Sequence, residues 1–203
     1  MTNATNDVRQ HILDTARIII AGKGFSAVGL NEVLQASGVP KGSFYHYFGS
    51  KEAFGEALLE DYFADYLASL DNLLSRPDLS AAQRLIAYFE YWLETQAACD
   101  PKGKCLAVKL AAEVSDLSEA MRLVLEQGTT RVIARLASAI EDGASDGSLP
   151  VELDASTTAN TLYQLWLGAS LCAKLTRDRV PMEAALAATQ GLLGLSSHLR
   201  RCA

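Results

Sequence analysis

The sequence predicts an all-α protein of about nine helices, and three observations lead to this prediction. Alanine and leucine, which both favour helices, are common throughout the 203 residues. Valine, isoleucine and threonine are scattered rather than alternating with polar residues, so no segment shows the two-residue period of a strand. Apolar residues make up 49% of the chain and charged residues 21%, which is the composition of a globular protein with a packed core.

The first three expected helices are short. Residues 8–21 place isoleucine, leucine and alanine side chains at helical spacing along one face, and glycines follow directly. Residues 30–36 form the second expected helix, which ends at Ser37-Gly38-Val39. Pro40 then starts a third helix over residues 41–48, because proline is tolerated in a first helical turn.

Longer helices are expected after the break at Gly49-Ser50. Ser50 and Ser80 provide N-cap hydroxyls for two of them. The change from short to long helices predicts an N-terminal domain over residues 1–50 and a larger C-terminal domain over residues 51–203. The expected helices of the larger domain cover residues 51–74, 81–98, 105–114, 118–142, 155–176 and 182–199.

Residues 30–48 have the dimensions of a helix-turn-helix, in which two short helices are joined by a tight turn. From Gly38 to Lys51 the chain has two lysines and a histidine but no acidic residue. A helix N-terminus surrounded by such donors suits contacts to DNA phosphates and base edges. The alternative is a purely structural three-helix bundle. Under either interpretation Phe44 and Phe48 are expected in the core.

The charge of the chain is unevenly distributed. Its 18 basic and 24 acidic residues give a net charge of −6, which taken alone argues against a nucleic-acid partner. Residues 1–51, however, hold five basic and three acidic side chains, so the acidic balance belongs to the remainder of the chain. The sequence therefore allows DNA binding by the N-terminal part, and such binding should weaken as salt rises.

The N-terminal motif resembles the TetR family of repressors over residues 8–55. The resemblance is carried by Gly24-Phe25, by Val33 to Val39, and by Lys41-Gly42-Ser43-Phe44-Tyr45-His46-Tyr47-Phe48 followed by Ser50-Lys51-Glu52. It implies an all-helical homodimer with an N-terminal domain for palindromic double-stranded operator DNA and a C-terminal effector domain. The residues that it assigns to DNA are Lys41, Gly42, Ser43, Tyr45 and His46 on the recognition helix, and Lys51, which usually grips phosphate.

The sequence departs from that family pattern in one place. Many relatives have a pair of threonines before the second helix, where a hydroxyl reaches phosphate. This chain has Ala27-Val28-Gly29 there, and Ser26 is the candidate substitute for the hydroxyl.

The cysteines do not have the spacing of a metal site. No two of them form a CxxC pair, and the three histidines lie far apart, so neither zinc nor another metal is expected. The N-terminus lacks the apolar core of an export signal, which predicts reduced thiols in the cytoplasm. The four cysteines are Cys99, Cys105, Cys172 and Cys202.

Cys105 has the chemically most suggestive surroundings. It stands at the expected start of a helix, with Lys102, Lys104 and Lys109 close in sequence. A helix N-terminus and nearby cations both lower the pKa of a thiol and favour the nucleophilic thiolate. The alternative is that Cys105 is a small buried apolar residue, as is expected of Cys172.

Two further segments resemble the NemR-type, electrophile-sensing subgroup of the TetR family. They are Gly103-Lys104-Cys105-Leu106-Ala107-Val108-Lys109 with the residues up to Val114, and Leu165-Trp166-Leu167-Gly168-Ala169-Ser170 with Lys174. The resemblance implies that Cys105 is a redox sensor and that Lys174 traps its oxidised sulfur. It also implies quinones, reactive aldehydes, N-ethylmaleimide-type alkylators and hypochlorous acid as inducers that release the operator and derepress detoxification genes.

Two other functions compete with this interpretation. One is a repressor that binds an apolar or aromatic ligand reversibly, in a pocket lined by Tyr88, Trp92, Tyr163 and Trp166. The other is an enzyme with Cys105 as nucleophile, which is disfavoured because no histidine lies near it in sequence to act as general base. We therefore expect neither an enzyme nor a cofactor.

The last two expected helices carry few charges. Residues 155–173 are uncharged and nearly long enough to span a membrane, but their serines, threonines, asparagine and glutamine favour burial in protein. We expect these helices to form a four-helix dimer interface, the alternative being burial within one subunit. The faces expected in it are Leu162, Leu165, Trp166, Ala169 and Ala173 on one helix and Ala185, Ala188, Leu192 and Leu195 on the other.

Overall fold

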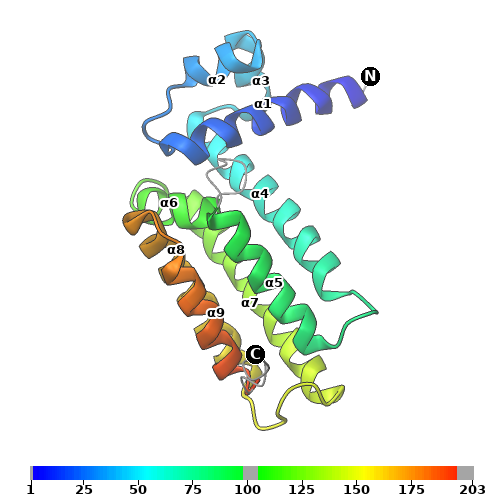
Figure 1. The fold of residues 1–203 in the computed structure, drawn as a ribbon. Coiled ribbons are helices and arrows are strands. Elements are labelled where there is room, and N and C mark those ends of the chain that lie inside the picture. The colour runs from blue at the N-terminus through cyan, green and yellow to red at the C-terminus, as the bar shows by residue number, and fades with distance from the viewer. Residues whose placement is uncertain (1, 98–104, 196–203) are drawn as a thin grey trace. The chain divides into compact units, whose positions relative to one another are not determined.

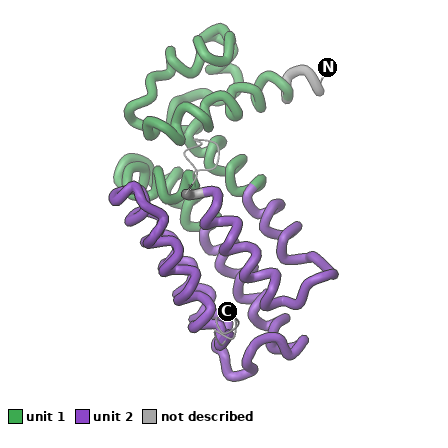
Figure 2. The backbone as a smooth tube through the Cα atoms, in the orientation of Figure 1, with its two compact units in different colours: residues 1–65, 100–128 green, residues 66–99, 129–203 purple. Residues whose placement is uncertain are grey.

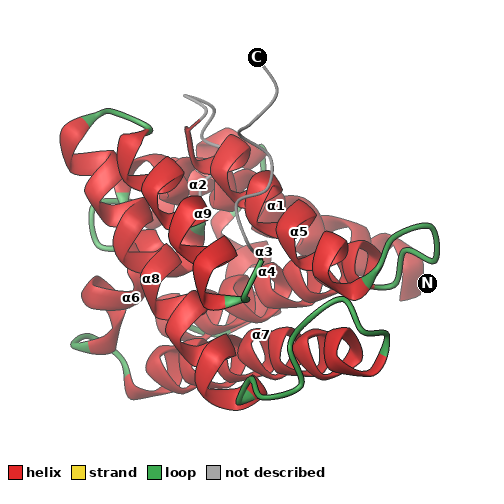
Figure 3. Ribbon diagram, turned by 60° about the horizontal axis from the view of Figure 1, so that its bottom comes forward, coloured by secondary structure: helices red, strands yellow, loops and turns green. Residues whose placement is uncertain are grey.

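The computed structural model describes residues 2–97 and 105–195, which are mainly helical (Figures 1 and 3). Within these ranges, turns and loops connect nine α-helices, and there is no strand. The prediction of an all-α fold is therefore confirmed. The helices are α1 (Thr2–Lys23), α2 (Leu30–Ser37), α3 (Lys41–Phe48), α4 (Lys51–Leu74), α5 (Ala81–Ala97), α6 (Leu106–Ser115), α7 (Glu119–Ser145), α8 (Ala155–Thr176) and α9 (Val180–Leu192).

Two helices have a boundary that differs from the predicted one by more than three residues. Helix α1 begins at Thr2 rather than at residue 8, because the polar segment before residue 8 contains no glycine or proline to stop a helix. Helix α9 ends at Leu192 rather than at residue 199. The reason is Gly194, whose φ of 68° is the left-handed conformation that commonly terminates helices.

The chain is divided into two compact units (Figure 2). Unit 1 consists of residues 1–65 and 100–128, and unit 2 consists of residues 66–99 and 129–203. Helix α6 and the first part of α7 thus belong to the same unit as the N-terminal helices, which the boundary expected at residue 50 does not anticipate.

Glycine, proline and serine fix the helix-turn-helix within unit 1. Gly38 adopts φ 66° and ψ 23° after α2, a left-handed conformation that costs glycine little. Pro40, with φ −62° and ψ 145°, is the N-cap of α3. Gly49, with φ 71°, ends α3, and the Ser50 hydroxyl then accepts the Ala53 N–H at 3.0 Å at the start of α4. These local signals explain why the two short helices were predictable.

Aromatic rings form the centre of the N-terminal part of unit 1. Phe44 and Phe48 on α3 and Phe54 on α4 are all buried. Their ring centroids lie 5.1 Å to 5.2 Å apart in tilted and edge-on arrangements, which are the favourable geometries for aromatic pairs. The prediction that Phe44 and Phe48 are core residues is confirmed, and α3 is thereby anchored by one face only.

Unit 2 has a core in which large side chains of α5, α7, α8 and α9 meet. Phe89 and Trp166 are fully buried, with their rings stacked 5.0 Å apart. The Trp166 indole N–H donates to the Thr189 hydroxyl at 2.8 Å, so this buried polar group is satisfied.

The inward faces of α8 and α9 differ from those expected at a dimer interface. Leu162, Trp166, Ala169 and Ala185 belong to the core of unit 2, so the assignment of these four residues to the interface is wrong. Residues 155–173 of α8 carry no charge, so the hydrophobic pattern of the helix could not identify the buried face. Ala188 and Leu192 of the expected α9 face are exposed. Other exposed residues of these two helices include Thr161, Gln164, Gly168, Leu171, Lys174 and Leu175 on α8 and Ala184, Ala187 and Gly191 on α9.

No helix in the described ranges is both long enough and apolar enough to cross a membrane.

Candidate DNA-binding face and cysteine site

Helix α3 buries its aromatic side and exposes its polar side. Lys41, Gly42, Tyr45 and His46 are exposed and Ser43 is partly exposed. Tyr45 keeps 47% of its surface accessible while its ring contacts Phe44 edge-on at 5.6 Å. The five residues predicted on the recognition helix therefore lie away from the core. They present hydroxyl, ammonium and imidazole groups to solvent.

The N-terminus of α3 is suited to an anion. Its N-cap, Pro40, supplies no side-chain hydrogen bond, and its first turn contains no acidic residue. The partial positive charge of a helix N-terminus and its backbone N–H groups attract phosphate. Lys41 and Ser43 stand in the same turn, so charge and donors coincide there.

Lys51 has a structural contact besides its predicted DNA role. Its Nζ donates to the Val28 carbonyl oxygen at 2.9 Å and lies 5.0 Å from the centre of the Phe25 ring. The lysine at the start of α4 thus fastens the connection between α1 and α2. The contact of Lys51 with a DNA phosphate stays a prediction.

Glu113, on α6, contacts that same connection and was not identified from the sequence. Its carboxylate accepts the backbone N–H of Phe25 at 3.1 Å and that of Ser26 at 2.5 Å. Partial burial acts to raise the pKa of Glu113. The hydrogen bonds from Ser26 and Phe25 and the charge of Lys109 outweigh it, so the pKa lies below its ordinary value. Ser26, the candidate phosphate contact, is exposed, with its backbone held by Glu113.

Lys109 lies one turn before Glu113 and contacts the end of α1. Its Nζ donates to the Gly22 carbonyl oxygen at 3.3 Å, where a cation also suits the negative end of the helix dipole. We refer to Lys109 and Glu113 together as the α6 clamp. Gly24 lies beneath it with φ 97°, and a Cβ at that position would lie 2.9 Å from the Glu113 Oε2 atom.

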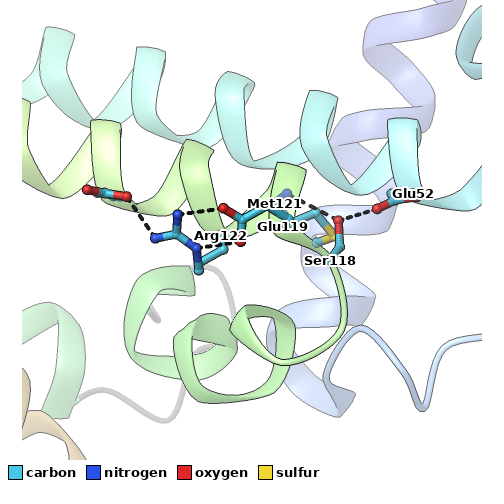
Figure 4. Close-up of polar contacts among 6 residues, drawn as sticks. Glu52, Ser118, Glu119, Met121 and Arg122 are labelled. Atoms are coloured by element: carbon cyan, nitrogen blue, oxygen red, sulfur yellow. Dashed lines mark hydrogen bonds and ion pairs between the residues drawn. The ribbon is translucent and has the colours of Figure 1, made fainter.

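Ser118 connects α7 to α4 within the same unit (Figure 4). Its hydroxyl donates to the Glu52 Oε1 atom at 2.5 Å and accepts the Met121 N–H at 3.2 Å, so it caps α7, as predicted from its position in the sequence. On the next turn Arg122 pairs with Glu119 at 2.7 Å and with Glu126 at 2.8 Å. The start of α7 is thereby fixed to the first turn of α4.

Cys105 is the N-cap residue of α6 and is buried, with 7% of its surface exposed. The Tyr62 hydroxyl lies 3.2 Å from its Sγ atom. Burial raises the pKa of the Cys105 thiol, while the Tyr62 hydroxyl and the backbone N–H groups of Val108 and Ala107 act to lower it. The expected lowering of this pKa is therefore wrong, because the sequence pattern did not reveal the burial.

The structure describes only one of the three lysines expected to stabilise the Cys105 thiolate, Lys109. Lys109 donates to Gly22 instead. Lys102 and Lys104 lie outside the described residues, as do Cys99 and Cys202. Cys172 is exposed on α8, so its expected place in the core is wrong.

Tyr62 in turn contacts helix α1. The Arg17 guanidinium lies 5.2 Å from the centre of the Tyr62 ring, and its Nη1 atom forms an ion pair with Asp65 at 2.7 Å. Cys105, Tyr62 and Arg17 therefore form a continuous series from the N-cap of α6, through α4, to α1. All belong to unit 1.

Lys174, the predicted partner of Cys105, is an exposed residue near the end of α8 and belongs to unit 2. Its role toward the cysteine stays a prediction. Among the described residues, no group of three or more potential metal ligands lies together.

The four aromatic residues predicted to line a ligand pocket gather within unit 2. Trp92 lies 5.8 Å, centroid to centroid, from each of Tyr88, Tyr163 and Trp166. Its indole N–H donates to the Ser170 hydroxyl at 3.1 Å. The rings thus pack on one another as a core cluster, with at most 4% of any of them exposed. That these four residues line a ligand pocket stays a prediction.

A short helix-turn-helix with an uncapped, acid-free N-terminus on its second helix defines the class of protein, a helix-turn-helix regulator. Comparison with known families agrees. Residues 12–58 match the family described as "Bacterial regulatory proteins, tetR family", and residues 81–189 match "Tetracyclin repressor-like, C-terminal domain". The chain belongs to the TetR family of transcriptional regulators.

Similar proteins cover almost the whole chain. The HTH-type transcriptional repressor NemR of Escherichia coli is 42% identical over 188 residues, which are 93% of this chain and 94% of NemR. The HTH-type transcriptional repressor DhaR of a Mycobacterium species is 32% identical over 180 residues, 89% of each chain. The crystal structure of the reduced form of E. coli NemR covers 94% of this chain and 99% of its own, with a TM-score of 0.88 at 42% identity.

Proposed function

We propose that this regulator is a repressor that binds a palindromic operator as a homodimer and releases it when Cys105 is oxidised or alkylated by a reactive electrophile. The observation that carries the proposal is the position of Cys105. It caps the helix whose clamp, Lys109 and Glu113, holds the connection between α1 and α2 of the DNA-binding part. A change at one end of α6 therefore acts on backbone groups next to the helix-turn-helix.

The exposed side of α3 supports the DNA part of the proposal. Lys41, Ser43, Tyr45 and His46 offer donors for phosphate and base edges, and Gly42 allows close approach of the backbone. Lys51 contributes a positive charge at the start of α4. A two-fold dimer would present two such helices to the two half-sites of a palindrome.

The chemistry of Cys105 supports the choice of inducer. A thiol forms covalent adducts with quinones, reactive aldehydes and N-ethylmaleimide, and it is oxidised by hypochlorous acid. Similarity to NemR, whose structure is described for its reduced form, is consistent with a redox-dependent state. We infer that the regulated genes encode enzymes of detoxification, and that the exposed Lys174 reacts with or stabilises the oxidised sulfur.

The exposed faces of α8 and α9 support the dimer. Gly168, Leu171 and Leu175 on α8 follow one another at intervals of three and four residues, and half or more of each leucine is exposed. Ala184, Ala188 and Gly191 give α9 a face of small residues. Uncharged faces of this kind suit a four-helix interface between two subunits. A protein that acts on operator DNA would work in the cytoplasm.

The test compares operator binding before and after reaction with excess N-ethylmaleimide in the wild type, in Cys105→Ser and in the control Cys172→Ser. The reaction is continued until mass spectrometry shows that Cys105 of the wild type is fully modified. We expect release by the wild type and by Cys172→Ser, because Cys172 lies on the other unit. Cys105→Ser should bind operator and keep it, because serine is a favoured N-cap residue and has no reactive sulfur. Normal release by Cys105→Ser would disprove the sensor role.

The alternative inducer is a small aromatic or apolar ligand bound reversibly beside Tyr88, Trp92, Tyr163 and Trp166. The observation that supports this alternative ligand is the packing of the four rings into one cluster. Mass spectrometry after exposure to a quinone distinguishes the two, since only the covalent mechanism leaves an adduct on Cys105. The covalent mechanism is stoichiometric, so we expect no enzymatic turnover of the electrophile.

A further inference from the structure

We propose that Tyr62 is a positioning residue for the chemistry of Cys105, holding the sulfur at the N-cap of α6 and donating a hydrogen bond from its hydroxyl to the thiolate that attacks an electrophile. This inference rests on the proposed function, in which Cys105 is the reacting group. It assigns a specific task to a residue of α4 that no sequence motif singles out.

The geometry brings the two groups together in a protected place. The Tyr62 oxygen and the Cys105 sulfur lie 3.2 Å apart, although 43 residues separate them in sequence. Only 4% of Tyr62 and 7% of Cys105 is exposed, so water competes little for this contact. A buried polar pair of this kind is maintained by the fold rather than by chance encounter.

The direction of the hydrogen bond depends on the state of the sulfur. In the thiol either atom can donate, whereas a thiolate can only accept, so the tyrosine must then be the donor. Hydrogen bonds to an ionised acceptor are roughly twice as strong as neutral ones. Tyr62 therefore stabilises the thiolate more than the thiol, and this offsets part of the penalty that burial imposes on the charged sulfur.

The charged surroundings of Tyr62 favour its role as donor. From α1, Arg17 places its guanidinium 5.2 Å from the ring centre, and a cation over an aromatic face draws electron density away from the phenol. Asp65 on α4 holds that guanidinium by an ion pair at 2.7 Å. On α6, the backbone N–H groups of Val108 and Ala107 act in the same direction as Tyr62 on the pKa of the Cys105 thiol, lowering it. Tyr62 thus provides the side-chain part of a set of donors.

The reaction balances without a further reagent. Ionisation of Cys105 gives its proton to solvent, and the sulfur electron pair then forms a bond to one alkene carbon of N-ethylmaleimide. The π electrons of the alkene move to the other alkene carbon. This carbon takes a proton from water, and no group leaves the maleimide. Tyr62 keeps its own proton throughout. The product is a neutral thioether, a weak acceptor, so the hydrogen bond to Tyr62 is weaker after the reaction.

The principal experiment measures how fast N-ethylmaleimide modifies Cys105 in the full chain as a function of pH, by mass spectrometry of the peptide that contains it. Tyr62→Phe removes the hydroxyl but keeps the ring beneath Arg17. Tyr66→Phe is the matched control. Tyr66 lies one turn further along α4 and belongs to unit 2, and its hydroxyl lies 2.6 Å from the Tyr88 hydroxyl.

We expect Tyr62→Phe to react about tenfold more slowly near neutral pH and to have its pH midpoint about one unit higher, as follows from losing one hydrogen bond to a charged group. At pH values above both midpoints the difference should vanish. Tyr66→Phe should stay within about twofold of the wild type, because the hydroxyl that it removes contacts the Tyr88 hydroxyl. Equal rates for Tyr62→Phe, or a slower rate with an unchanged midpoint, would overturn the proposal.

A second variant keeps the proposal testable if Tyr62→Phe does not fold. Incorporation of 3-fluorotyrosine at position 62 retains the shape of the ring and makes the phenol a stronger donor. The midpoint for Cys105 should then move to lower pH, and an unchanged midpoint would contradict the role of Tyr62. These readouts use no DNA. Failure of fully modified wild type to release operator would therefore refute the proposed function while leaving the Tyr62 measurement interpretable.

Discussion

Different kinds of interaction stabilise the interior of unit 1 and the interior of unit 2. In unit 1, polar contacts between separate helices fix the segments around the helix-turn-helix, as shown by Lys51 on Val28, the α6 clamp on residues 22–26, and Ser118 on Glu52. In unit 2, stacked aromatic rings fill the centre, and the polar atoms of its tryptophans are satisfied inside the core. The polar contacts of unit 1 each contribute little to its stability, whereas a few large side chains contribute much of the stability of unit 2.

This difference indicates where the molecule can change at low cost. A hydrogen bond contributes about 1 kcal/mol, while a buried tryptophan contributes several times that amount. Contacts like those of the α6 clamp can therefore be exchanged one at a time, but the aromatic cluster cannot. A regulator benefits from having exchangeable contacts next to its DNA-binding part and a stable core elsewhere.

The largest effect is expected from Trp166→Ala. The side chain is fully buried against Phe89 and Trp92, so its removal should lower the free energy of unfolding by about 3–5 kcal/mol. Urea denaturation at a fixed protein concentration measures this. Val151→Ala is the control, because Val151 is 73% exposed and should change the value by less than about 0.5 kcal/mol. A similar loss for both would show that unit 2 has no concentrated core.

Gly24→Ala should have an intermediate effect on unit 1. A φ of 97° is unfavourable for alanine, and the added Cβ would lie 2.9 Å from the Glu113 carboxylate. We expect a loss of about 1–3 kcal/mol in the free energy of unfolding together with weaker operator binding. Gly22→Ala, where nothing lies within 4 Å of a Cβ, should be neutral or slightly stabilising. Equal behaviour of the two variants would mean that the clamp does not constrain this turn.

The smallest effect is expected from Glu113→Gln, and it should depend on pH. Because the pKa of Glu113 is lowered in the folded state, its carboxylate stabilises the fold above the ordinary glutamate pKa of about 4.3. That stabilisation is lost as pH falls through the lowered folded-state pKa. The wild type should exceed the variant by about 1 kcal/mol at neutral pH, and the difference should shrink in acid. Chemical denaturation across this range measures it.

Glu60→Gln is the control for that experiment, because Glu60 is an exposed glutamate on α4. It should show no comparable change in the difference between neutral and acidic pH. A pH-independent effect of Glu113→Gln would mean that the charge of the carboxylate is not what holds Phe25 and Ser26.

The sequence was informative wherever structure follows from neighbours along the chain. Gly38, Pro40 and Ser50 mark the helix-turn-helix, and they appear in the structure as a left-handed cap, an extended N-cap and a hydroxyl cap. Phe44 and Phe48 lie one helical turn apart, so their shared burial was predictable as well.

Contacts between distant segments were not predictable in the same way. Glu113 contacts Phe25, which is 88 residues away in sequence, and Tyr62 contacts Cys105, which is 43 residues away. The local sequence around these residues does not indicate which distant residue each one contacts. For the same reason, burial of Cys105 reversed the expected direction of its pKa shift. The outward face of α8 was misassigned because residues 155–173 carry no charge on either face, so only packing decides which face is buried.

Burial of Cys105 also sets a time scale. An electrophile reaches an enclosed sulfur only when the segments that cover it open briefly while Tyr62 and Cys105 stay in contact, so the observed rate is the intrinsic rate of this pair multiplied by the open fraction. Such a sulfur reacts slowly with a passing pulse of reagent and steadily with a sustained one, and it favours small reagents over bulky ones. In the proposed sensor role, Cys105, with 7% of its surface exposed, would register accumulated exposure rather than momentary concentration.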